Sequence, residues 1–239
     1  MGIFLQSILG LLTSFFSFFY FTDVFRNRKS LSKKSYPGLL GVGFSTNFLD
    51  TLGIGSFAQQ TALFKFFKLI DDRLIPGTMN VGNTIPTVVQ AFIFMTSVNV
   101  DPVTLISVST AAPIGAVLGA GIVSRLSRRK IQQGMGIGLF VVALIILSGL
   151  LNWLPLGGEA IMMTATAMLM VAGSSRFIKE NAYDRKTAIA LTIAGVVGVF
   201  LAAYVVKSLP LNTLKWIVCG VVFYTSLMML RSAQSEKSR

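Results

Sequence analysis

The chain has 239 residues, of which 53% are hydrophobic and only 13% are charged. Soluble domains carry roughly a quarter of their residues as charged side chains. The apolar residues fall in runs near the ~20 residues with which an α-helix crosses a bilayer. The composition therefore predicts an all-α, polytopic (multi-pass) membrane protein. The chain contains no histidine and a single cysteine, which excludes histidine catalysis, histidine metal sites, an intrachain disulfide and a thiolate zinc cluster. No cofactor is expected.

The first apolar run, Met1–Phe25, is rich in phenylalanine and is followed by the basic segment 26–34. A secretory signal has its positive charge before the apolar core and a small-residue cleavage site after it. The order is reversed in this chain, so we expect a retained transmembrane helix. The positive-inside rule places its N-terminus outside the cell.

The second apolar segment, Tyr36–Ile70, is interrupted at Asp50–Gly55, and each half is short for an ordinary membrane span. Non-helical backbone is tolerated at membrane depth only where protein buries it or where it lines an aqueous cavity. Short, glycine-interrupted segments are accordingly the best sequence pointer to the binding site of a transporter. We expect either a re-entrant hairpin or two short spans at this place.

Six further apolar runs have lengths near one membrane crossing, and they are Gly77–Ser97, Pro102–Ser124, Ile131–Leu151, Ile161–Ser175, Thr187–Leu209 and Leu211–Leu230. With the first helix they predict seven crossings, with the N-terminus outside and the C-terminus cytoplasmic. In this topology 19 of the 21 Lys and Arg residues are cytoplasmic, and only Lys207 and Lys215 are not. Orientation and attraction to the anionic lipid bilayer then explain the net charge of +12, and no nucleic acid is needed as a partner.

An internal repeat relates two of these runs. Residues 101–126 align without gaps on residues 184–209. Nine of the 26 positions are identical: Asp101/Asp184, Thr104/Thr187, Ile106/Ile189, Ala111/Ala194, Gly115/Gly198, Leu118/Leu201, Ala120/Ala203, Val123/Val206 and Leu126/Leu209. The two copies cross the membrane in opposite directions, which predicts an inverted repeat of three-helix units with a broken or re-entrant hairpin in the first. We expect a leading helix and basic turn at 1–35, a first repeat at 36–151 and a shortened second repeat with a cytoplasmic tail at 152–239.

Asp50 is the sharpest functional candidate, because an acid within an apolar membrane segment is by default a functional-site hypothesis. Asp50 either holds a proton or a cation at the tip of the broken segment or caps the following helix, a position that Asp favours. Gly53, Gly55 and Ser56 could open a helix whose free N–H groups and positive dipole end meet an anion. Close helix packing or a plain kink is the alternative. The neighbouring polar residues Asp50, Gln59 and Gln60 favour the anion site, and an acid beside an anion suggests proton coupling.

A polar stripe follows one face of the next helix, and its members are Asn80, Asn83, Thr87 and Gln90. The stripe faces either the translocation path or a neighbouring helix, to which it would hydrogen-bond. Pro86, on the same helix, frees the backbone carbonyl of Gly82. The predicted substrate-binding residues are Asp50, Gly53, Gly55, Ser56, Gln59, Asn80 and Asn83. No metal site is predicted.

Several motifs follow one another in a fairly specific order over roughly residues 41–230. They are Gly53-Ile54-Gly55-Ser56, Gly77-Thr78 at the start of a helix, Asp101 after a short loop, Gly115 and Gly119 at a Gly-x-x-x-Gly spacing, and the basic turn Arg125–Lys130. This order resembles the TauE/SafE-type permeases, the sulfite and organosulfonate exporter superfamily. The resemblance implies a cell-membrane carrier of a small anion such as sulfite, a sulfonate or another organic acid, and not an enzyme. Proton or cation coupling and a homodimer are left open.

The chain departs from the family at the start of the second repeat, where a second glycine-broken hairpin is expected. The stretch between Leu151 and Ile161 is too short to hold one. We also expect Ile161–Ser175 to be a short helix, about 22 Å long against a hydrocarbon core of ~30 Å. The alternative function is therefore a non-transporting remnant or a membrane assembly subunit of the same family.

Overall fold

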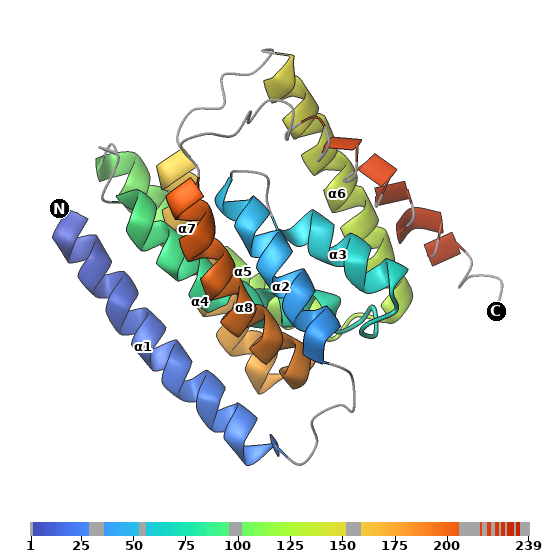
Figure 1. The fold of residues 1–239 in the computed structure, drawn as a ribbon, viewed down its shortest axis with the longest axis horizontal. Helices are drawn as coiled ribbons and strands as arrows, with labels where there is room; N and C mark the ends of the chain where they lie inside the picture. The colour runs from blue at the N-terminus through green and yellow to red at the C-terminus, as the bar shows by residue number, and fades with distance from the viewer. Residues whose placement is uncertain are drawn as a thin grey trace.

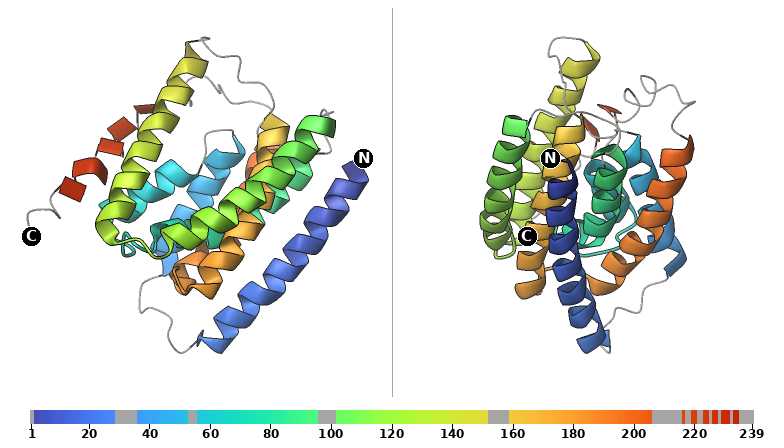
Figure 2. Two further views of the ribbon diagram at one scale, coloured as in Figure 1. Left: turned by 180° about the vertical axis from the view of Figure 1, so that it is seen from behind. Right: turned by 90° about the vertical axis from the view of Figure 1, so that its left-hand side faces the viewer.

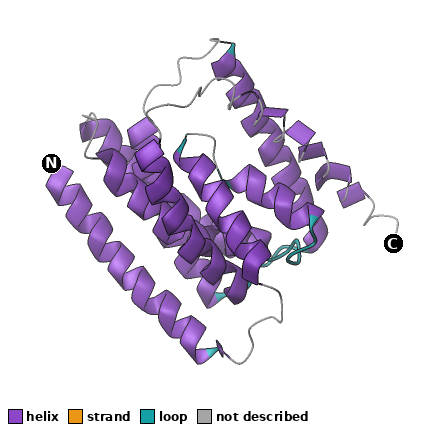
Figure 3. Cartoon of the chain, viewed as in Figure 1, coloured by secondary structure: helices purple, strands orange, loops and turns teal. Residues whose placement is uncertain are grey.

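The computed structural model describes residues 2–28, 36–52, 56–95, 102–151 and 159–205, together with scattered residues between 216 and 234. All regular structure in these ranges is helical (Figure 3), which confirms the all-α fold for the described part of the chain. The helices are α1 (Gly2–Arg26), α2 (Tyr36–Thr51), α3 (Phe57–Phe66), α4 (Ile75–Met95), α5 (Pro102–Val123), α6 (Arg128–Leu150), α7 (Glu159–Lys179) and α8 (Arg185–Val205).

Helix α7 corrects one expectation from the sequence. It runs from Glu159 to Lys179 and has 21 residues, not the fifteen of Ile161–Ser175. At ~1.5 Å per residue its length is about 32 Å, which is enough to cross a bilayer core. The short-helix prediction is wrong because Arg176 and Lys179 lie inside the last helical turn, where positive side chains interact favourably with the helix dipole. The proposed site of the lost hairpin includes 152–158, which lie outside the described residues.

Three helices, α4, α7 and α8, form the centre of the molecule (Figures 1 and 2). Helix α4 packs on both α7 and α8, while α2 packs on α8 and α5 packs on α7. Helix α1 lies along α7 and α4 at one edge of the molecule. At the other edge the helical residues between 216 and 234 lie along α6, where the Ser226 hydroxyl donates to the Gly136 carbonyl at 2.7 Å.

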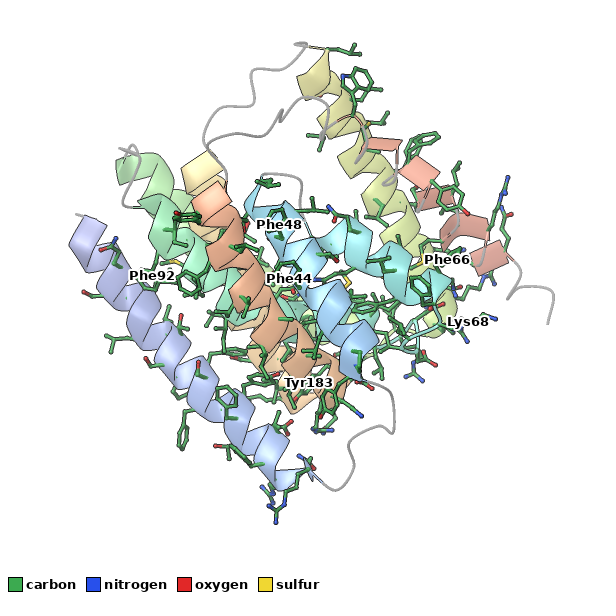
Figure 4. The ribbon with its side chains drawn as sticks, in the orientation of Figure 1. Phe44, Phe48, Phe66, Lys68, Phe92 and Tyr183 are labelled. Carbon is green, nitrogen blue, oxygen red and sulfur yellow. The ribbon has the colours of Figure 1, made fainter. Side chains whose placement is uncertain are left out.

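The contact between α2 and α8 is unusually close because glycines lie in it. A Cβ atom added to Gly198 would lie 2.6 Å from the carbonyl oxygen of Phe44, and one added to Gly43 would lie 2.9 Å from the Cα of Leu191. Phe44 and Phe48, labelled in Figure 4, stack along α2 with their ring centroids 6.0 Å apart. Small residues at such crossings let two membrane helices approach backbone to backbone. The broken segment is thereby held directly against α8.

Two described helical stretches, Gln6–Arg26 and Arg185–Tyr204, are long and apolar enough to cross a membrane, and Pro113–Val123 is a shorter apolar helix. Helices α4 to α7 have between 21 and 23 residues, close to the ~20 needed to span. The full count of seven crossings stays a prediction.

The basic turns of the chain gather at one end of the helices. Ion pairs connect them: Asp72 lies 3.3 Å from Arg128, and Asp23 lies 2.8 Å from Arg185. The segments brought together in this way are the end of α1 and the turns 67–74, 124–127 and 180–184. These segments therefore lie at the same end of the described helices, and the side of the membrane on which that end lies stays a prediction.

Candidate functional site

Buried polar side chains concentrate on α2, α3 and α4, the segment that the sequence marks as broken and polar. They include Thr46, Asn47, Thr51, Ser56, Gln59, Gln60, Thr61, Thr78, Asn83, Thr84, Thr87 and Gln90. Burying an amide or a hydroxyl is unfavourable unless it finds a hydrogen-bond partner. The partners of these groups therefore indicate how the site is assembled.

Four of these residues form a hydrogen-bonded group, which we call the amide cluster: Thr46, Asn47, Gln60 and Asn83. The Asn83 amide nitrogen donates to Gln60 Oε1 at 2.7 Å, and Gln60 Nε2 donates back to Asn83 Oδ1 at 2.9 Å. Gln60 Nε2 also donates to the Thr46 hydroxyl at 2.8 Å, and Asn47 Nδ2 donates to Asn83 Oδ1 at 3.1 Å. The amide cluster thus joins α2, α3 and α4 through side chains that lie at most 1% exposed.

Helix α8 closes one side of the amide cluster. A Cβ atom added to Gly195 would lie 2.8 Å from Asn47 Nδ2 and 2.8 Å from Pro86 Cγ, so only glycine fits this position without rearrangement. Asn47 Nδ2 also donates to the Gly43 carbonyl at 2.9 Å. Its two bonds fix the orientation of the amide, and Asn47 Oδ1 is left as a buried acceptor without a hydrogen-bond partner among the described residues. The cluster therefore retains capacity for a proton donor or a cation.

The break between α2 and α3 places Asp50 beside the start of α3. Ser56 occupies the N-cap position of α3, and its side chain makes no cap hydrogen bond. Asp50 lies in the last turn of α2, partly buried, and accepts hydrogen bonds from the backbone N–H and the side chain of Ser56. The carboxylate therefore interacts with the positive end of α3 from across the break instead of occupying the cap position itself. Gly53 and Gly55 lie outside the described residues.

The polar stripe on α4 divides between two neighbours. Asn83 belongs to the amide cluster, whereas Asn80 points toward α7: a Cβ atom on Gly173 would lie 3.6 Å from Asn80 Oδ1. Asn80 Oδ1 is buried and has no hydrogen-bond partner among the described residues. Four positions after Asn80, the Thr84 hydroxyl forms a hydrogen bond with the Ser174 hydroxyl of α7 at 2.7 Å. The structure thus separates Asn80 from Asn83, and the stripe makes inter-helix contacts on both sides.

Pro86 leaves the carbonyl of Gly82 without its usual donor inside α4, and the structure supplies another. The hydroxyl of Thr192, on α8, donates to the Gly82 carbonyl at 2.9 Å. The carbonyl that the sequence predicts to be freed by Pro86 is therefore paired by a side chain of α8.

An ionic group at the end of α3 was not expected from the sequence. The buried carboxylate of Asp72 forms an ion pair with Lys65, accepts a hydrogen bond from Gln132 at 2.6 Å and lies 3.3 Å from Arg128. Burial alone would raise the pKa of Asp72, but the hydrogen bonds from Lys65 and Gln132 and the nearby positive charges together lower it. These contacts connect the turn between α3 and α4 to α6.

Some of the predicted site residues lie close together in the structure, and the others lie apart from them or outside the described residues. Asp50 and Ser56 meet at the helix break, Gln59 is buried on α3 beside the amide cluster, and Asn83 lies within the cluster. The list of predicted substrate-binding residues left out Asn47 and Gln60, although both are amides in the apolar segment that the sequence singles out. Within the described ranges, no three His, Cys, Asp or Glu side chains are placed to hold a metal ion.

Comparison with known proteins agrees with the motif order. The family described as "Sulfite exporter TauE/SafE" matches residues 2–146 and 134–239, which together span nearly the whole chain. No curated protein and no solved structure matches the chain. The helical architecture, the polar helix break and this match over both halves of the sequence lead to one assignment: the chain belongs to the TauE/SafE sulfite exporter family, whose members are multi-pass membrane transporters.

Proposed function

We propose that this protein is a secondary transporter that moves a small anion, such as sulfite, a sulfonate or another organic acid, across the cell membrane. The observation that carries the proposal is the amide cluster, which gathers uncharged N–H donors at a helix break in an apolar protein. Amide donors and the start of a helix suit an anion, because they supply hydrogen bonds and a positive dipole end. The substrate-binding residues proposed are Asp50, Gly53, Gly55, Ser56, Gln59, Asn80 and Asn83.

The mechanism follows from competition for the same donors. In the structure, Gln60 and Asn83 satisfy each other's amides. An oxyanion accepts stronger, charge-assisted hydrogen bonds than an amide oxygen does, so it can replace the amide–amide bonds as the two repeat units rock. Asp50, hydrogen-bonded to Ser56 at the start of α3, would repel the anion while ionised. Protonation of Asp50 removes this repulsion and couples anion movement to a proton.

The proposed topology has the N-terminus outside, the C-terminus in the cytoplasm and three parts at 1–35, 36–151 and 152–239. The gathering of the basic turns at one end of the helices supports a common side for them. Single cysteines at Asp101, Glu159 and Arg128, in a Cys219→Ser background, test the orientation in intact cells. Labelling at position 128 by an impermeant reagent from outside would refute it.

A flux assay in proteoliposomes tests transport. Purified full-length protein should move sulfite or a short sulfonate down its gradient, and Asp50→Asn should abolish the dependence of flux on a pH gradient. Asp71→Asn, which removes an exposed acid outside the helices, is the matched control and should retain that dependence. An absence of flux for every anion tried, with Asp50→Asn indistinguishable from the unmodified chain, would sink the proposal.

A non-transporting remnant or a membrane assembly subunit is the second candidate. It is favoured by a single observation: the stretch between Leu151 and Ile161 is too short for a hairpin like the one at Tyr36–Ile70. The same flux assay separates the two candidates, because only the transporter moves anions when reconstituted alone.

A further inference from the structure

The hairpin formed by α2 and α3 is held firmly by α8 and α4. Helix α8 meets α2 backbone to backbone, since a Cβ atom added to Gly198 would lie 2.6 Å from the Phe44 carbonyl oxygen. The amide cluster joins both helices of the hairpin to α4 by buried hydrogen bonds. Separating these contacts would leave buried amides without partners, which is costly. The hairpin therefore stays with α4 and α8 in any movement of the molecule.

The contact between the hairpin and α6 is of a different kind. Leu52 and Ala58 of the hairpin form a buried apolar cluster with Leu139 and Ala143 of α6. Among the described helices, the close pairs are α2 with α8, α5 with α7, and α4 with α7 and α8, and α6 belongs to none of these pairs. Figure 1 shows α3 between α2 and α6. Lipid chains are as apolar as leucine, so membrane helices that do not approach closely gain little from apolar contact. This contact separates more readily than the α2–α8 crossing.

Helix α6 lies over the break between α2 and α3. Leu52, which precedes the break, and Ala58, which follows it, both pack on α6. Ser56, at the start of α3, is only 5% exposed. Non-helical backbone at membrane depth must be buried by protein or line an aqueous cavity. The structure has the first arrangement, and moving α6 away produces the second.

The first turns of α6 are anchored, in contrast to the rest of the helix. Gln132 donates to the Asp72 carboxylate at 2.6 Å, and Arg128 lies 3.3 Å from the same carboxylate. The short turn 124–127 joins this end of α6 to α5. Ala143 lies eleven residues after Gln132, which places it about 16 Å further along the helix. The ionic group around Asp72 is thus suited to act as a pivot, from which the part of α6 near Leu139 and Ala143 can swing.

The helical residues between 216 and 234 are attached to α6 and move with it. A Cβ atom added to Gly136 would lie 2.8 Å from two side-chain carbons of Leu230. The Ser226 hydroxyl donates to the Gly136 carbonyl at 2.7 Å, and the Phe140 and Phe223 ring centroids lie 5.7 Å apart. These contacts make α6 and the C-terminal residues one body.

We infer that α6 and the C-terminal residues attached to it form a movable cover over the helix break, with its pivot at Asp72. When the part of α6 near Leu139 swings away from the hairpin, water and an anion reach Asp50 and the start of α3. The inference rests on the proposed function, because it names the contact at which the transporter opens. The α2–α8 crossing stays closed throughout.

Thiol labelling in native membranes tests the movement without any need for transport. The full-length chain carries Cys219→Ser and one new cysteine, either Ala58→Cys, beside α6, or Ala194→Cys, at the α2–α8 crossing. The two alanines are matched controls, because both are buried, at 6% and 8% exposed, and they lie in the two contrasting contacts of the hairpin. A small hydrophilic thiol reagent should label position 58 about tenfold faster than position 194, since only the α6 contact opens. Equal rates, or faster labelling at position 194, would overturn the inference.

Cross-linking adds a test of the pivot. In the Cys219→Ser chain, a short cleavable thiol cross-linker joins either Ala58→Cys to Leu139→Cys, across the cover, or Asp72→Cys to Gln132→Cys, at the pivot. The first cross-link should reduce anion flux in proteoliposomes at least about tenfold, with recovery on cleavage, and the second should leave more than about half of it. Flux that survives the first cross-link, or that the second abolishes equally, would contradict the arrangement. If the chain moves no anion before cross-linking, the proposed function fails, and the labelling rates alone decide whether the cover moves.

Discussion

Removing the side chain of Asn83 should destabilise the folded protein by about 3 kcal/mol. Asn83→Ala deletes three hydrogen bonds, two accepted from Gln60 and Asn47 and one donated to Gln60 Oε1. Such side-chain bonds average about 0.6 kcal/mol each in a membrane protein. The two donors keep other acceptors, Thr46 and the Gly43 carbonyl, but Gln60 Oε1 loses its donor, which costs at least about 1 kcal/mol more.

The measurement is the free energy of unfolding of the purified full-length chain in detergent. Asn80→Ala, one turn earlier on α4, is the matched control. It should lower the free energy of unfolding by less than about 1 kcal/mol, since the Asn80 Oδ1 atom has no hydrogen-bond partner among the described residues. The double variant Gln60→Ala/Asn83→Ala should be at least about 1 kcal/mol more stable than the sum of the single effects predicts. Equal losses at Asn80 and Asn83, together with additive behaviour at Gln60, would refute the reasoning.

Three further predictions concern the contacts around the site. Folding lowers the pKa of Asp72, so the ionised carboxylate stabilises the folded chain at pH values above the pKa of the unfolded carboxyl, and this stabilisation is lost as pH falls through the lowered pKa. Asp72→Asn should therefore remove this acid-sensitive part of the stability, as measured by the unfolding temperature between neutral pH and about pH 3. Arg185→Gln should lower the unfolding free energy by about 2 kcal/mol, because it breaks the two-atom contact with partly buried Asp23 and leaves that carboxylate less well paired. Gly198→Ala should lower the free energy of unfolding by at least about 2 kcal/mol, because the added methyl group forces α2 away from α8. In the control, Gly138→Ala, the added Cβ meets no described atom, so the free energy of unfolding should stay unchanged or rise by up to about 1 kcal/mol. Similar effects at both glycines would contradict the close crossing of α2 and α8.

Local patterns were sufficient to predict most helices of the fold. Helix α5 begins at Pro102, as expected, because a proline is tolerated in the first turn of a helix, where its missing N–H has no intrahelical partner. Helix α4 covers Ile75–Met95 against the predicted Gly77–Ser97. The error at α7 has the same origin as these successes: an apolar run marks the part of a helix at membrane depth, and α7 continues through Arg176 and Lys179 beyond it.

The contacts of the site could not be read from local patterns. The sequence identified Asp50 and Asn83 as polar residues in an apolar segment, but not which groups they meet. Asn83 meets Gln60 from 23 positions earlier, and Asp23 meets Arg185 across 162 positions. Helical periodicity describes the faces of one helix, whereas these pairs depend on how several helices pack. A single sequence carries no direct signal for such pairs.

The amide cluster also has a consequence for how the chain is made. Polar side chains are costly in lipid until they find partners, and α2 cannot reach its packing site on α8 until most of the chain has been synthesised. Asn47 and Gln60 do not have to wait for α8, because the Asn83 Oδ1 atom of the next long helix accepts a hydrogen bond from each of them. The hydrogen bonds that join Asn47, Gln60 and Asn83 can therefore form before α8 has been made, and the second half of the protein later closes over them.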